Sequence, residues 1–145
     1  MAVFRRQAHI DAPVRIVWEL VADPRRHPDW IPRVLEVECD EIGEGCQYRR
    51  VFKTPVGTDE TTLEIEKLED CHELLVRCLD SGTFNRFVVT EAQGGTFVDL
   101  EAGMDPTTPR YKLIDAVAGK RFYRRWTEQT LEALARAAAR ERSAI

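Results

Sequence analysis

Alternation of hydrophobic and polar residues dominates the chain as far as about residue 103. Residues 4–10 have a period of two, with Phe4, Arg6, Ala8 and Ile10 on one side and polar residues on the other, which predicts a half-buried strand that ends at Asp11. Six further alternating segments follow from residue 34 onward, and short turns rich in Gly, Pro or Ser separate them, for example at residues 43–45, 54–57 and 94–95. Strands joined by such short links pair antiparallel with their neighbours. The pattern therefore predicts a meander of six strands, and the first segment makes a seventh.

Helical periodicity replaces the alternation in two places. After Asp11 and Pro13, which suit the start of a helix, apolar residues recur three, four and seven positions after Val14. Prolines at positions 24, 28 and 32 then allow only a second helix of one or two turns. The helical period returns after residue 109 and continues to about residue 142, with Gly119 as a candidate position for a kink.

This order of elements, β-αα-β6-α, predicts an α+β fold. A strongly curved, seven-stranded antiparallel sheet would wrap its concave face around one long C-terminal helix, and the two short helices would close one end. No linker, repeat or low-complexity tract interrupts the pattern, so we expect a single domain over residues 1–145. A sheet that closes onto a helix tends to leave an apolar pocket between them, which is a usual position for a ligand site.

Composition and charge narrow the range of functions. The 145 residues are 43% hydrophobic, and 21 basic against 25 acidic residues give a net charge of −4. That acidic balance disfavours a nucleic-acid partner, because affinity for phosphates comes largely from positive fields. The first 15 residues contain charges and no apolar signal segment, and no apolar run reaches about 18 residues. We therefore expect a cytoplasmic protein without stable membrane insertion.

Cysteines and histidines show no metal-binding pattern. The four cysteines are separated by 7, 25 and 7 positions, unlike the CxxC spacings of zinc and redox sites, and we expect reduced thiols. His9, His27 and His72 have no ligand-like spacing, and we expect all three at the surface. Neither a metal nor a cofactor is predicted.

Four segments carry a family resemblance: residues 10–13 (IDAP), 17–24 (VWELVADP), 28–30 (PDW) and 94–96 (GGT). Together with the order of elements, they resemble the START-like, or SRPBCC, superfamily, in particular its polyketide cyclase/dehydrase and lipid transport branch. The resemblance covers essentially the whole chain. It implies the helix-grip fold and a cavity that binds hydrophobic or amphipathic molecules such as sterols, phospholipids, polyketides, plant hormones or quinones. Some members of the superfamily catalyse cyclisation or dehydration.

Two arginines are the candidate polar groups of such a cavity. If the strand alternation holds, Arg50 and Arg86 point inward, where a buried guanidinium needs an anion to offset its desolvation. A ligand carboxylate or phosphate is one such partner; a protein acid, or a side chain that reaches the rim, is the alternative. Trp30, in the proline-rich turn, belongs either to the core or to the edge of the pocket. The predicted ligand-binding residues are Trp30, Tyr48, Arg50, Phe52, Leu63, Cys78, Phe84, Arg86, Val88, Leu100, Met104, Tyr111 and Ile114.

Three functional hypotheses follow from these patterns. The first is binding of a hydrophobic or amphipathic small molecule, such as a lipid, a polyketide or an aromatic metabolite, between the sheet and the C-terminal helix. The second is a polyketide cyclase or dehydratase that uses the same pocket, although the sequence identifies no catalytic residue. The third is a protein-interaction module whose cavity has collapsed. The sequence leaves the oligomeric state open between a monomer and a homodimer.

Overall fold

The computed structural model describes residues 3–54 and 56–144, with the backbone alone for residue 118. The sheet consists of β1 (Val3–Ile10), β2 (Val34–Glu38), β3 (Gln47–Thr54), β4 (Gly57–Glu69), β5 (Glu73–Cys78), β6 (Thr83–Ala92) and β7 (Gly95–Met104). The helices are α1 (Val14–Ala22), α2 (His27–Trp30), α3 (Pro109–Ile114) and α4 (Lys120–Ser143), with a 3₁₀ turn at Pro24–Arg26 before α2. The predicted order β-αα-β6-α and the α+β helix-grip class are confirmed.

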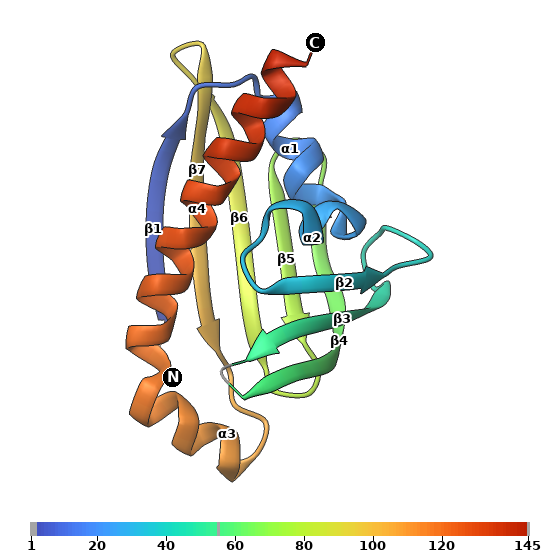
Figure 1. Cartoon of the computed structure of the whole chain (residues 1–145), viewed down its shortest axis with the longest axis vertical. Coiled ribbons are helices and arrows are strands. Elements are labelled where there is room, and N and C mark those ends of the chain that lie inside the picture. The colour runs from blue at the N-terminus through green and yellow to red at the C-terminus, as the bar shows by residue number, and fades with distance from the viewer. Residues whose placement is uncertain (1–2, 55, 145) are drawn as a thin grey trace.

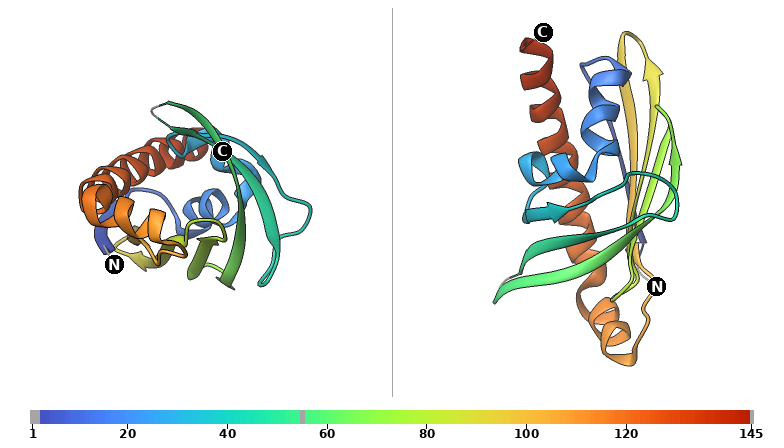
Figure 2. Two further views of the ribbon diagram at one scale, coloured as in Figure 1. Left: turned by 90° about the horizontal axis from the view of Figure 1, so that it is seen from below. Right: turned by 90° about the vertical axis from the view of Figure 1, so that its right-hand side faces the viewer.

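All seven strands form one antiparallel sheet in the order β1-β7-β6-β5-β4-β3-β2. Two register shifts, one between β2 and β3 and one between β4 and β5, let the sheet bend. Beyond these bends, β2, β3 and the far half of β4 turn across the front of the molecule, and α4 runs along the concave side (Figure 1). Seen from below, the strands and α4 enclose the interior from opposite sides (Figure 2).

The apolar face of α4 covers the concave side of the sheet, where it packs on β1 and β7, and α4 also packs against α1. The residues of this face are buried, and Leu134 has no exposed surface at all. The buried residues of α4 are Tyr123, Trp126, Thr127, Thr130, Leu131, Ala133, Leu134, Ala137 and Ala138. Charged residues occupy the opposite, exposed face, as the helical period requires.

The C-terminal helical segment is not one straight helix. A π-helical turn, Asp115–Gly119, joins α3 to α4, and α3 lies at an angle to α4 at the lower end of the molecule (Figure 1). A π turn accommodates one extra residue within a helix and changes its direction locally. The predicted kink at Gly119 therefore corresponds to a change of helix type over the five residues that end at this glycine. No helix within the described residues has the combination of length and hydropathy that crossing a bilayer requires.

His27 does not lie at the surface as its sequence position suggested, because its side chain is buried. Its Nε2 lies 2.8 Å from the carbonyl oxygen of Val21, and its ring centre lies 5.9 Å from that of Trp30, with the two rings nearly perpendicular. Burial lowers the pKa of His27 to about 4; the hydrogen bond to Val21 opposes this shift, and the positive charge of Arg50 adds to it. The proline-rich turn folds α2 back beneath α1, an arrangement that spacing along the chain does not show.

Removing the side chain of Leu134 tests the contact between α4 and the sheet. Leu134→Ala should lower the free energy of unfolding by about 3 kcal/mol, because a fully buried leucine loses its apolar transfer energy and leaves a cavity. Urea unfolding measures the change. Arg136→Ala, on the exposed side of the same helix, is the control and should change stability by less than about 0.5 kcal/mol. Equal effects of the two substitutions would contradict this packing.

The buried His27 should make stability depend on pH. The unfolded chain takes up the imidazole proton near pH 6.5 and the folded chain only near pH 4, so stability falls as the pH drops through this range. Between about pH 7.5 and 5, His27 alone should remove about 2 kcal/mol of stability. His27→Gln should flatten this part of the profile in urea titrations, whereas His72→Gln, at an exposed position, should retain the wild-type slope. An unchanged profile for His27→Gln would contradict the assignment.

Candidate functional site

A cavity of about 270 Å³ lies between the lower half of the sheet and the junction of α3 with α4. Strands β3 to β7 supply one wall, and Tyr111 to Trp126 supply the other. Exposed residues at its edge, among them Asp59, Ile114 and Phe122, show that the cavity opens to solvent between the β3–β4 hairpin and α3. The lining residues are Arg50, Phe52, Thr54, Asp59, Thr61, Cys78, Ser81, Thr83, Asn85, Met104, Tyr111, Ile114, Asp115, Gly119, Phe122, Tyr123 and Trp126.

Three aromatic rings form an apolar wall of this cavity. The ring centre of Trp126 lies 5.6 Å from that of Phe52 and 6.2 Å from that of Phe122. The rings of Trp126 and Phe122 are almost parallel and stack on each other. The indole N–H of Trp126 donates a hydrogen bond of 2.8 Å to the side-chain oxygen of Asn85 on β6. This bond fixes the orientation of the indole, so the wall presents a defined flat surface to a ligand.

Arg50 is the cationic group of the cavity. It projects inward from β3, its guanidinium lies 5.1 Å from the ring centre of Phe52, and its register partner on β4 is Thr61. The Nε of Arg50 and the hydroxyl of Thr61 are buried, and neither has a hydrogen-bond partner within the described residues. Burial lowers the pKa of Arg50 from its usual value, and the nearby Tyr48 and Cys78 only partly oppose the shift. The cavity wall thus contains a partly desolvated cation that forms no ion pair with an acid of the described chain.

The remaining polar groups of the cavity are hydrogen-bond donors and acceptors. Burial raises the pKa of Tyr123 to about 12, so its phenol keeps its proton at neutral pH and can donate a hydrogen bond. The hydroxyls of Ser81 and Thr83 lie 2.8 Å apart and bond to each other where β6 begins. Asp59, on the β3–β4 hairpin, stands at the exposed edge. This set can orient a polar ligand group, with Arg50 as its only cation among the lining residues.

The structure brings together about half of the residues that the sequence predicted for the site. Six of them line the cavity: Arg50, Phe52, Cys78, Met104, Tyr111 and Ile114. Three others, Tyr48, Leu63 and Leu100, belong to the buried core and do not reach the cavity surface. Whether any of these residues contacts a ligand stays a prediction.

On β6 the predicted orientation is wrong, because Phe84, Arg86 and Val88 lie on the convex face of the sheet. Arg86 donates a hydrogen bond of 2.6 Å to the buried carboxylate of Glu73 instead of pointing into the cavity. The guanidinium of Arg77 covers the ring of Phe84 at 5.1 Å. The turn before β6 sets this register, and a shift of one residue exchanges the two faces of a strand.

Asn85 and Thr83, on the same strand, line the cavity although the sequence pattern did not single them out. The signal that could have found Asn85 is an amide side chain among the apolar and basic residues at 84 and 86–89, and no comparable signal marks Thr83. Trp30 is a further correction: it is a core residue and not an edge residue of the cavity. Its indole N–H donates to the carbonyl oxygen of Leu20 at 3.0 Å, and its ring packs against Phe87 at 6.4 Å.

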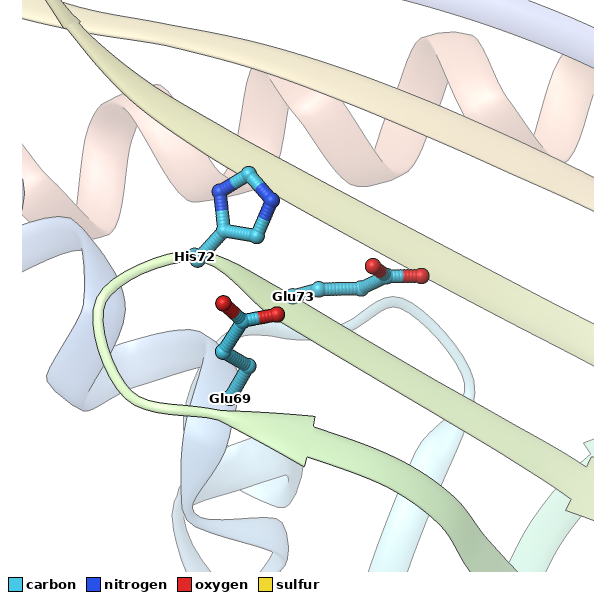
Figure 3. Close-up of side chains that lie close together, drawn as sticks. All are labelled: Glu69, His72 and Glu73. Carbon is cyan, nitrogen blue, oxygen red and sulfur yellow. The ribbon is translucent and has the colours of Figure 1, made fainter.

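Glu69, His72 and Glu73 come close together at the β4–β5 turn, with potential ligand atoms within 4.8 Å of one another (Figure 3). Both oxygens of Glu73 already have cationic partners, Arg86 at 2.6 Å and Lys67 at 3.0 Å. The hydrogen bond from Arg86, the strongest influence, helps to hold the pKa of Glu73 below its usual value. Ion pairing on the convex face therefore accounts for the carboxylate of Glu73.

Solved structures share this architecture. The closely superimposing chains include protein TTHA0849 from Thermus thermophilus, at 16% identity and a TM-score of 0.77, covering 97% of this chain and 99% of that one. Protein BH1534 from Bacillus halodurans has 19% identity and a TM-score of 0.74, with 95% and 97% covered. Protein NE0264 from Nitrosomonas europaea has 15% identity and a TM-score of 0.73, with 97% and 96% covered. At these identities the likeness shows the fold alone.

Sequence comparison supplies the family. No curated protein sequence is significantly similar to this chain. The family model described as "Polyketide cyclase / dehydrase and lipid transport" matches residues 1–139, almost the whole chain. With the seven-stranded sheet, the covering helix and the cavity between them, the chain belongs to the polyketide cyclase/dehydrase and lipid transport family.

Proposed function

We propose that this protein binds a small amphipathic molecule with an anionic group in the cavity between the sheet and the α3–α4 junction. The family supports binding of a hydrophobic ligand. Arg50 is the reason to expect that this ligand also has an anionic group. Its guanidinium lines an otherwise mostly apolar cavity, and no described carboxylate pairs with it. The ligand's acid would pair with Arg50 and accept a further hydrogen bond from Thr61.

The free energy needed to bury a charge favours an anionic partner for Arg50. A cation withdrawn from water loses roughly several kcal/mol of hydration unless a partner restores the interaction. The ring of Phe52 returns only a part of this, about 0.5–2 kcal/mol for a cation–π contact. A carboxylate that enters the cavity supplies charge-assisted hydrogen bonds, which are about twice as strong as neutral ones. The protein groups of the site are therefore electrostatically incomplete by themselves, and an anion completes them.

The size and the walls of the cavity limit the rest of the ligand. A volume of about 270 Å³ lies just below the roughly 300–1,000 Å³ of typical small-molecule sites. It suits an aromatic or short-chain acid, and it is too small to enclose a whole two-chain phospholipid. The stacked rings of Phe122 and Trp126 favour a flat apolar body. Burial of that body would supply about 25 cal/mol for each Å² removed from water.

A cyclase or dehydratase activity would use the same cavity. Tyr123 favours the role of a hydrogen-bond donor to a ligand carbonyl, because its raised pKa of about 12 makes it a poor base near neutral pH. Turnover of a poly-ketone substrate that is lost in Tyr123→Phe while binding persists would support this second function. The third hypothesis, an interaction module, expected a collapsed cavity, and the open 270 Å³ volume weighs against it.

Without ligand, Arg50 should lower stability. Arg50→Met should raise the free energy of unfolding by about 1 kcal/mol, because an apolar side chain replaces a partly buried, unpaired cation. Arg49→Met is the matched control: the neighbouring arginine faces the other way and pairs with Glu36, Glu38 and Glu60. Its loss should lower stability by at most about 1 kcal/mol. Urea unfolding of both variants measures this, and a clear destabilisation by Arg50→Met would contradict the proposal.

The same pair of variants tests ligand binding, with 2-naphthoate and 2-naphthylmethanol as matched acid and alcohol probes. Calorimetry should show that the wild type binds the acid about tenfold more tightly than the alcohol, a difference that one charge-assisted hydrogen bond supplies. Arg50→Met should abolish this preference, and Arg49→Met should keep it. Equal affinity of the wild type for both probes would overturn the anionic part of the proposal. Native mass spectrometry of protein from its own host would identify the natural ligand class.

A further inference from the structure

Exposed apolar side chains gather around the opening of the cavity. Val56, at the tip of the β3–β4 hairpin, is 97% exposed, Leu113 on α3 is 66% exposed, and Val117 on the π turn is 78% exposed. Ile114 and Phe122, which line the cavity itself, are also exposed. Five of the nine exposed large hydrophobic residues within the described chain thus belong to the two segments that border the opening.

These side chains come from two segments on either side of the opening. The hairpin contributes Thr54 and Asp59 to the cavity edge, and the segment from α3 to the start of α4 contributes Ile114 and Asp115. Both segments lie at the lower end of the molecule, away from α1 and α2 (Figure 1, Figure 2). The apolar tips therefore protrude on both sides of the cavity and do not form a groove of their own.

Basic residues are concentrated on the α3–α4 side of this opening, whereas the hairpin side has the exposed acids Asp59 and Glu60. Between residues 106 and 127 the chain has six basic residues and a single acid, Asp115, although its net charge as a whole is −4. Asp115 is buried, whereas Lys112, Lys120 and Arg121 are exposed. Among the described residues, none of these three cations lies in an ion pair, in contrast to Arg26 and Arg142 nearer the other end of the molecule. Residues 53–60 and 105–125 together have seven basic and four acidic residues, so this end of an acidic protein has a net positive charge.

We propose that this end of the molecule docks reversibly on an anionic lipid surface. The docking surface consists of Val56, Leu113 and Val117 as apolar tips and of Lys112, Lys120 and Arg121 as the cations on the α3–α4 side. Protruding apolar side chains that insert at the interface, with cations beside them at the level of the headgroups, form the usual arrangement of a peripheral membrane contact.

A bilayer fits this surface better than a protein partner does. A protein interface concentrates its energy in pockets that receive anchor residues, and here the exposed side chains protrude from two separate segments around a hole. A fluid lipid surface needs no matching shape. The cavity opens between the tips, so a hydrophobic ligand would pass between the bilayer and the cavity without crossing water. This last step rests on the proposed function, whereas docking itself does not.

Sedimentation with lipid vesicles tests the proposal. The wild type should bind vesicles of phosphatidylcholine and phosphatidylglycerol, mixed about 3:1, about tenfold more tightly than vesicles of phosphatidylcholine alone, and about 0.5 M salt should remove the difference. Lys112→Glu/Arg121→Glu should weaken binding to the anionic vesicles about tenfold or more. Arg136→Glu/Arg140→Glu changes the net charge equally at the far end of α4 and should retain binding within about threefold.

A second pair of substitutions separates insertion from attraction between net charges. Leu113→Ser/Val117→Ser leaves every charge in place and should weaken vesicle binding about fivefold, because less apolar surface enters the interface. Failure of the wild type to bind anionic vesicles, or equal losses in the near and far charge variants, would overturn the proposal. Binding of 2-naphthoate in solution is measured on the same variants and should be unchanged, since none of these residues lines the cavity. Absence of naphthoate binding by the wild type, with vesicle binding intact, would refute the proposed function alone.

Discussion

The packing of α4 on the concave face of the sheet is the interaction on which the rest of the structure depends. Its apolar stripe covers β1 and β7 and holds the curved sheet against it, with Leu134 and Ala138 completely buried. At the lower end the chain changes to a π turn and then to α3, and the bends in the sheet carry β3 and β4 away from the helix axis. The side chains there cannot meet, and a cavity remains where the upper half has a packed core.

The electrostatics of the sheet divide sharply between its two faces. On the convex face, Arg5 pairs with Asp99, Arg77 with Glu66, and Arg86 with Glu73. Arg50, one position from the well-paired Arg49, faces the cavity without such a partner among the described residues. A protein that keeps an unneutralised cation in its interior sacrifices stability there, and such sacrifices concentrate at functional sites. This contrast between adjacent arginines is the reason why an anionic ligand is a better explanation than a structural role.

One segment that borders the opening of the cavity is also the most basic segment of the chain. The basic segment at residues 106–127 stands out against a net charge of −4, and it contains the same α3 and π turn that form the edge of the cavity. Leu113, Ile114 and Val117 on α3 and the π turn are exposed, whereas the apolar residues further along α4 face the sheet. The segment from α3 to the start of α4 thus contributes a wall of the cavity, its edge and the cations outside it. The proposed ligand site and the proposed docking surface therefore share this segment.

Sequence periodicity determined the fold, because the spacing of apolar residues in strands and helices is a local property. It can be recognised in the sequence without knowing any tertiary contact. Element order, the covering helix and six residues of the cavity could be predicted in this way, Arg50 among them. Tertiary structure alone decided the rest. The turn that precedes β6 placed Arg86 on the convex face, the prolines buried His27 and Trp30 under α1, and the π turn aimed α3 at the cavity. Each outcome depends on a single-residue register or a chain reversal, whose energy comes from contacts between segments far apart in the sequence.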